Sequence, residues 1–140
     1  ELYGPPTSLP WGISIAAKNR IAPWDDLAAY PLETTRFHPT FAYEMLWNLL
    51  AAGLLLGIEK QWGKKLKPGT TFIAWLILAG LGRFLIESFR PDQPLIPGAA
   101  ISFSRLIAGL MALFGVLWML ARYKKIKLPG LSHMPEKYKI

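Results

Sequence analysis

The sequence contains 140 residues, of which 52% are hydrophobic and only 18% are charged, and its mean hydropathy is +0.26. Soluble domains contain about 25% charged residues, so this composition predicts a membrane protein and excludes a disordered chain. Cysteine is absent from the sequence, which excludes a disulfide framework, a cysteine-ligated zinc site and a cysteine nucleophile of the chain's own.

Residues 1–37 contain neither a membrane span nor a clear soluble domain, because prolines interrupt them repeatedly. We expect an irregular segment that faces outward and packs over helix ends, with a short strand near Trp11 to Ala16. The chain begins with Glu, and its first apolar stretch begins near residue 41, so no signal peptide is predicted. We therefore expect the chain to be the downstream part of a longer protein.

Three apolar windows follow, at Phe41 to Ile58, Thr70 to Phe89 and Ile101 to Ala121. A bilayer core of about 30 Å needs about 20 helical residues, so each window is long enough to cross it. The sequence predicts an all-α integral membrane protein with spans at 38–58, 70–89 and 101–121, within a larger bundle. Loops at 59–69 and 90–100 join the spans, and a basic tail occupies 122–140. A soluble three-helix bundle is the alternative, but the windows are apolar around most of their circumference.

Basic residues predict the orientation of these spans. They gather in loop 59–69 and in the tail, at Lys60, Lys64, Lys65, Lys67, Arg122, Lys124, Lys125 and Lys127. Loop 90–100 and residues 1–37 are almost balanced in charge. The positive-inside rule therefore places the basic regions in the cytoplasm and these two regions outside. Three consecutive spans require the same alternation of sides. Most of the net charge of +7 is therefore a topology signal, and it argues against nucleic acid as a partner.

Ionisable residues inside the second span are the strongest functional signal. Arg83, Glu87 and Arg90 lie four and three residues apart, which places them on one helical face with a summed charge of +1. Each charge within a span costs about 3 kcal/mol on insertion scales, so such residues usually have a function. Guanidinium groups bind phosphate through paired hydrogen bonds, so the stripe suits an anionic headgroup. A self-neutralising ion-pair ladder and arginines that extend to the interface are the alternatives.

Polar residues in the other spans are weaker candidates. His38 precedes Pro39 at the start of the first span, where it could cap the helix, and Tyr43 and Glu44 could bond to another span. Arg105 in the third span could add a cation to the site or mark the headgroup level. The sequence predicts no metal site and no cofactor, because no histidine or carboxylate pair has metal-ligand spacing.

Motifs along the chain resemble those of the bacterial prolipoprotein diacylglyceryl transferase family, in its C-terminal half. The motifs are E-x-x-G-x-P-T-x-x-P-W-G at residues 1–12, R-F-H-P-T with Y-E at 36–44, and G-R-F with E and F-R at 82–90. The resemblance runs from residue 1 to about residue 121. It implies transfer of the diacylglyceryl group of phosphatidylglycerol to the lipobox cysteine of a prolipoprotein, at the outer face of the bacterial plasma membrane.

The resemblance also implies roles for individual residues. Arg83 is similar to an essential arginine of the family, Glu87 shares the catalytic assignment, and Arg90 supports binding of phosphatidylglycerol. Glu1 and Gly4 match the last two positions of a signature whose arginine would lie before residue 1. His38, Tyr43 and Glu44 match an element that we interpret as site architecture. The implied partners are phosphatidylglycerol, a prolipoprotein peptide and membrane lipids.

Three hypotheses for function remain open at this point. The first is diacylglyceryl transfer, for which this chain alone is expected to be inactive because the signature arginine is missing. The second is a fragment of an anion transporter or channel, with the charged stripe lining its pathway. The third is a non-catalytic membrane assembly subunit in which the polar residues only hold helices together.

Overall fold

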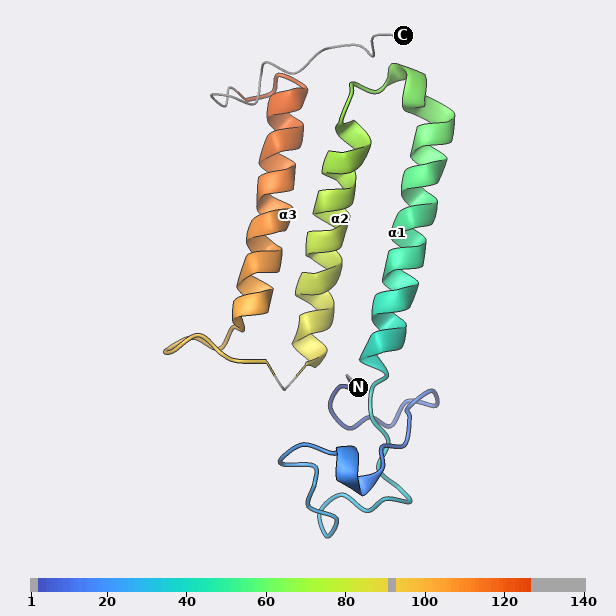
Figure 1. Ribbon diagram of the computed structural model, residues 1–140, viewed down its shortest axis with the longest axis vertical. Helices are drawn as coiled ribbons and strands as arrows, with labels where there is room; N and C mark the ends of the chain where they lie inside the picture. Colours follow the sequence, from blue (N-terminus) through green and yellow to red (C-terminus); the bar gives the residue numbers. More distant parts are fainter. Residues whose placement is uncertain (1–2, 91–92, 127–140) are drawn as a thin grey trace.

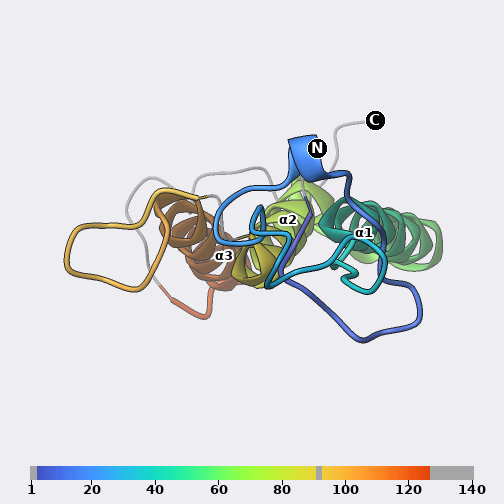
Figure 2. The same ribbon diagram turned by 90° about the horizontal axis from the view of Figure 1, so that it is seen from below.

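The computed structural model describes residues 3–90 and 93–126, and this part of the chain contains helices but no strand. Helices α1 (Thr40–Trp62), α2 (Thr70–Ile86) and α3 (Phe103–Arg122) lie in one layer with α2 in the middle (Figures 1 and 2). Neighbouring helices are antiparallel. Three single-turn 3-10 helices accompany them, η1 (Ala17–Asn19), η2 (Gly63–Lys65) and η3 (Glu87–Phe89). The predicted all-α class is confirmed.

All three long helices have the length and hydropathy needed to cross a membrane. Large apolar side chains remain exposed around α1, where Leu49, Leu50 and Leu56 are 62%, 72% and 71% exposed. Soluble monomers rarely expose apolar surface of this extent to water, whereas the lipid-facing surface of a membrane protein is apolar. The structure therefore favours the membrane protein over the soluble bundle.

The helix bounds differ from the predicted spans in ways that local chemistry explains. α1 continues beyond Ile58 to Trp62, because glutamate, lysine and glutamine are good helix formers and extend the helix past its apolar part. α3 begins at Phe103, two residues later than the apolar window. Ser102 sets this start, since its side chain accepts a hydrogen bond from the backbone N–H of Arg105.

Glycines bring α2 close to both neighbours. A Cβ atom at Gly80 would lie 2.7 Å from the backbone nitrogen of Ala112 on α3, and one at Gly82 would collide with the indole of Trp47 on α1. Trp47 also donates a hydrogen bond to the Leu78 carbonyl, 2.9 Å away. The ring therefore packs against α2, because a glycine on that helix makes room for it.

The N-terminal segment has a small aromatic core of its own. Tyr3, Trp24 and Phe37 pack together, and Phe37 is completely buried. Phe37 also forms isolated bridges with Pro6 and Ile13. The strand expected near Trp11 to Ala16 is absent from this described region, because only Ile13 pairs and the chain then turns into η1. The pairing is thus limited to single residues on either side of one buried ring.

This segment lies across the ends of α1 and α2 (Figure 2). The Gly4 N–H donates to the His38 carbonyl at 2.8 Å, and a Cβ atom at Gly4 would lie 2.7 Å from the Phe89 carbonyl oxygen. Trp11 reaches α1 through a hydrogen bond from Nε1 to the Tyr43 hydroxyl, 2.9 Å long. The expected packing over helix ends is therefore present, and it holds the segment beside the charged residues of α2.

At the other end of the layer, the loop between α1 and α2 is tied to α3. Arg122 Nε donates to the Pro68 carbonyl, and Lys67 Nζ donates to the Arg122 carbonyl, both at 3.1 Å. The basic residues of the loop and of the end of α3 therefore gather at the end opposite the N-terminal segment (Figure 1).

Candidate functional site

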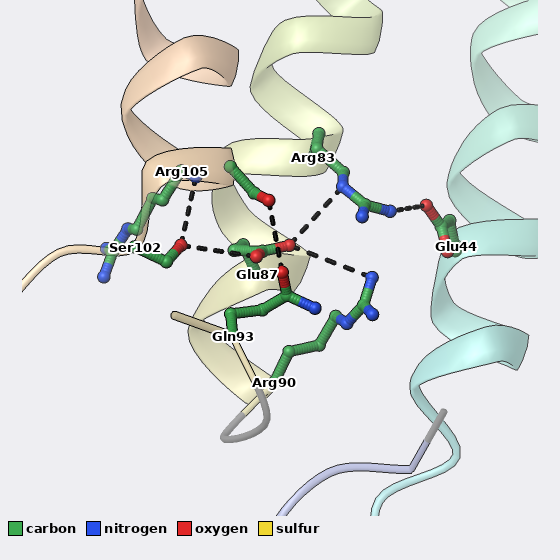
Figure 3. Close-up of polar contacts among 8 residues, drawn as sticks. Glu44, Arg83, Glu87, Arg90, Gln93, Ser102 and Arg105 are labelled. Carbon is green, nitrogen blue, oxygen red and sulfur yellow. Dashed lines mark hydrogen bonds and ion pairs between the residues drawn. The ribbon is translucent and has the colours of Figure 1, made fainter. Parts of the chain in front are cut away.

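The Arg83 side chain extends from α2 toward α1 and contacts one carboxylate on α1 and one in η3 (Figure 3). Its Nη1 donates to Glu44 Oε1 at 2.6 Å, and its Nε lies 3.4 Å from Glu87 Oε2, four residues further along the chain. The Arg83 side chain is 36% exposed, so the guanidinium is oriented by two anions while part of it stays accessible. The expected bond from Glu44 to another span is confirmed.

Glu87 is the buried centre of the cluster, with a side chain that is 0% exposed. Its Oε2 lies between Arg83 and Arg90, the second at 4.0 Å from Arg90 Nη1. Its Oε1 accepts a hydrogen bond from the Ser102 hydroxyl, 3.3 Å away at the start of α3. Both oxygens therefore face groups of the protein, and Glu87 joins α2 to α3 while it orients two arginines.

Arg90 is the more enclosed arginine, with a side chain that is 7% exposed. The Gln93 amide contacts it from the following loop. With its nitrogen 3.3 Å from Glu87 Oε1, as the neighbouring donors and acceptors require, its oxygen accepts from Arg90 Nη2 at 2.7 Å. The Arg90 side chain is thus held in place by Glu87 of η3 and by Gln93 of the loop.

The sequence interpretation omitted Ser102 and Gln93 from the site. Ser102 was identifiable as a helix cap, since serine at a boundary commonly accepts a bond from the third helical residue. Its second role, donating to Glu87, depends on how α3 packs against α2. Gln93 lies in a loop rich in proline, and no local pattern marks it as a partner of Arg90.

Charge in the cluster differs from the value read along α2 alone. The stripe of Arg83, Glu87 and Arg90 sums to +1, but Glu44 from α1 reduces the total to zero. A ladder within one helix was the alternative explanation, and its ion pairs are present. The shortest pair crosses to α1, so the ion pairs are not confined to one helix, and the two arginines are balanced by two carboxylates. An anion at Arg83 could contact only the donors that its two carboxylates leave available.

Arg105 does not join this cluster. Its guanidinium lies over the Phe84 ring, 4.6 Å from the centroid, and its side chain points away from Glu87 (Figure 3). The proposal of a third cation at the site was therefore wrong. A guanidinium is attracted to the face of an aromatic ring, and Phe84 on the neighbouring helix provides one.

His38 and Tyr43 form an aromatic group beside the cluster. The Tyr43 hydroxyl accepts from Trp11, so it can donate its own hydrogen to His38 Nδ1, 2.8 Å away. The rings of His38 and Tyr43 also pack against Phe89. His38 does not cap α1 with its side chain, because its ring turns toward Tyr43. These contacts join the N-terminal segment to α1 and to η3.

Of the two predicted signature residues, Gly4 is buried against α1 and η3, and Glu1 lies outside the described residues. Gly4 contributes a close backbone approach that a side chain would prevent. The described cluster offers an oriented, partly exposed guanidinium to an oxyanion. Its one buried carboxylate is already held by arginine and serine, which is unsuited to a group that must exchange protons with a ligand.

Comparison with known proteins identifies what this arrangement is similar to. The family model for prolipoprotein diacylglyceryl transferase matches residues 1–121. Curated relatives named phosphatidylglycerol–prolipoprotein diacylglyceryl transferase include one from Chloroflexus aggregans, 42% identical in an alignment 100 positions long that covers 66% of this chain and 32% of the relative. A Bifidobacterium longum relative is 38% identical in an alignment 114 positions long that covers 79% of this chain and 33% of the relative.

The chain spans about a third of the length of these curated relatives. No solved structure gives a significant match. The matched region contains α1, α2, η3 and nearly all of α3, together with the N-terminal segment.

Proposed function

Because the chain belongs to the prolipoprotein diacylglyceryl transferase family, we propose that it forms part of a membrane enzyme that transfers the diacylglyceryl group of phosphatidylglycerol to a prolipoprotein. The acceptor is the thiol of the lipobox cysteine in that substrate. This assignment agrees with a chain that contains no cysteine, because the nucleophile arrives with the acceptor. The reaction is the first step of bacterial lipoprotein maturation.

One observation supports the proposal most directly. Arg83 is the cation that is both oriented, by Glu44 and Glu87, and still 36% exposed. Its Nη2 and a second Nη1 hydrogen remain available as donors, because the two described ion pairs use Nη1 and Nε. A phosphate oxygen placed there would be bound through charge-assisted hydrogen bonds.

The reaction forms a bond between the thiol sulfur and the carbon of the diacylated glycerol that carries the phosphate. It breaks the bond from that carbon to the phosphate ester oxygen. Glycerol phosphate leaves with the electron pair. Arg83 stabilises the negative charge that develops on this leaving group, in a site of low dielectric constant. The thiol proton must pass to a base or to water, and a positive field from the arginines favours the thiolate.

Supporting roles follow from the contacts. Arg90 holds Glu87 and adds positive potential at the phosphatidylglycerol site, and Gly4 lets the N-terminal segment approach η3. Glu87, expected from the sequence to be catalytic together with Arg83, acts in this proposal as a positioning residue for Arg83, since its buried carboxylate has no exposed oxygen that could take a proton from a ligand. His38, Tyr43 and Glu44 form the frame of the site, and Glu1 is assigned to lipid binding by its place in the family signature.

We further propose that the enzyme lies in the bacterial plasma membrane with the Arg83 end of the bundle toward the outer face. The gathering of lysines at the opposite end supports this orientation through the positive-inside rule. Residues 1–37 and 90–100 are then extracytoplasmic, and loop 59–69 and the tail at 122–140 are cytoplasmic.

The experiment uses the protein expressed from its complete gene, phosphatidylglycerol vesicles and a lipobox peptide, with lipidated peptide measured by mass spectrometry. Arg83→Ala is expected to abolish transfer. The matched control is Arg105→Ala, which removes an arginine at a similar depth that lies outside the cluster. Near-normal lipidation by Arg83→Ala would overturn the assignment, and so would an equal loss in both variants.

A further inference from the structure

An apolar groove runs between α1 and α2 on the side of Arg83 that lies nearer the middle of the spans. It has a volume of about 140 Å³ and is lined by Trp47, Leu50, Ala51, Leu54 and Leu78. Every lining side chain is hydrophobic. The single polar group among them, the Trp47 indole N–H, is already bonded to the Leu78 carbonyl. The groove therefore has no polar group to offer and suits a hydrocarbon ligand.

The groove is continuous with the charged site along the same two helices. Glu44, Trp47, Ala51 and Leu54 are separated by three, four and three residues, which places them along one face of α1. On α2, Leu78 precedes Arg83 by five residues, which corresponds to about 8 Å along the helix axis. The ion pair of Arg83 and Glu44 thus stands at one end of a row of apolar side chains on α1, and the amide of Asn48 borders this row one turn beyond Glu44.

Trp47 forms the boundary between the polar and apolar parts. Its indole is locked against Gly82 and hydrogen-bonded to the carbonyl of Leu78, so it cannot swing out to fill the groove. Ala51 follows it one turn along, and this small side chain leaves the space open. The opening therefore comes from a fixed ring and a small residue.

We propose that this groove binds one acyl chain of the anionic phospholipid whose phosphate contacts Arg83. This inference rests on the proposed function and extends it to the lipid tail. A glycerophospholipid carries its phosphate and its chains in the same order, anionic at the interface and apolar toward the bilayer centre. The charge complementarity at Arg83 and the continuity of the face select such a lipid over a plain hydrocarbon or a second protein helix.

The gain from the groove is one of shape, because the surrounding lipid is as apolar as the groove. Fixed walls hold the chain and hence the glycerol carbon that the thiol must attack. We therefore expect an effect on lipid KM and on chain preference rather than on the chemical step.

Two measurements test this site in the protein expressed from its complete gene. First, Ala51→Phe fills the groove, while Ala52→Phe adds the same ring at the next, exposed position of α1. With long-chain phosphatidylglycerol we expect Ala51→Phe to raise KM about three- to tenfold, as lost packing contacts would, with kcat almost unchanged. A lipid with very short chains should show a much smaller change, and Ala52→Phe should resemble the wild type. Equal behaviour of the two variants would overturn the proposal.

Second, phosphatidylglycerol with a photoreactive diazirine in one chain is cross-linked to the wild-type protein, which avoids any dependence on variant folding. Saturable labelling of Ala51, Leu54 or Leu78, displaced by unlabelled lipid, supports the proposal. Uniform, non-saturable labelling around α1 would show bulk lipid only, and absent labelling would show another helix in the groove; both overturn it. Transfer that persists in Arg83→Ala would instead refute the proposed function, and the labelling pattern would still report on the groove.

Discussion

Arg83 on α2 and Glu44 on α1 form the shortest described ion pair in the charged cluster, with 2.6 Å between Nη1 and Oε1. The two residues are 39 positions apart in the sequence, and their ion pair joins α1 to α2. It also opposes the function proposed for Arg83, because a carboxylate competes with phosphate for the same guanidinium. Orientation by Glu44 and binding of an anion must therefore use different edges of one planar group.

Removal of Glu44 should separate orientation from competition. Glu44→Ala is expected to lower kcat for transfer about tenfold or more, because the lost charge-assisted bond contributes roughly 1.5–3 kcal/mol to holding the guanidinium. Glu44→Gln keeps an oxygen that can accept from Arg83 and should lose less. Steady-state kinetics of the peptide assay gives kcat and KM for each variant. Asn48→Ala, on an exposed residue one turn further along α1, is the control, and a loss there as large as that in Glu44→Ala would contradict this role.

Glu87 should matter more to stability than to proton transfer. Glu87→Ala removes the anion between Arg83 and Arg90 and leaves buried positive charge uncompensated, which costs about 3–5 kcal/mol of unfolding free energy. Glu87→Gln keeps the shape and one acceptor and should cost less. Thermal unfolding in detergent measures the difference. If Glu87→Gln unfolds like the wild type yet is as inactive as Arg83→Ala, Glu87 acts in proton transfer and the positioning role is wrong.

Arg90→Lys should weaken transfer without abolishing it. Lysine keeps the positive charge but lacks the planar fork that meets both Glu87 and Gln93. The loss of one charge-assisted bond of roughly 1.5 kcal/mol corresponds to about a tenfold fall in kcat/KM. Arg105→Lys is the matched substitution outside the cluster, where an ammonium can still lie over Phe84, and it should remain active. Equal activity of Arg90→Lys and the wild type would show that charge alone suffices.

Periodicity was sufficient to predict the face shared by Arg83, Glu87 and Arg90, since the 3.6-residue repeat applies to any helix. It could not identify which anion Arg83 prefers. Glu44 was recognised only as a residue able to reach another span, and the packing of α1 against α2 decided that the partner is Arg83. The summed charge was misjudged for the same reason.

Other parts of the site depended on contacts that leave little local signal. Arg105, like Arg83, is an arginine within an apolar window of the sequence, yet its guanidinium lies over the Phe84 ring and outside the cluster. Trp47 resembles an interfacial anchor until Gly82 on the next helix is placed beside it. In both cases a single neighbouring residue on another helix decides the outcome, and such pairs are not encoded in the spacing along one segment.

Glycine substitutions test the helix packing that supports the site. A Cβ atom at Gly82 would collide with the Trp47 indole, so Gly82→Ala must push α1 away from α2 or displace the ring from its bond to Leu78. Overpacking of this kind costs about 1–3 kcal/mol, and the displaced α1 would carry Glu44 away from Arg83. Gly53→Ala is the matched control, because a Cβ atom there meets nothing described within 4 Å and alanine favours the helix. We expect Gly82→Ala to lower both the unfolding temperature in detergent and transfer activity, and Gly53→Ala to retain both. If Gly82→Ala were as stable and active as Gly53→Ala, α1 would not need its close contact with α2 to position Glu44.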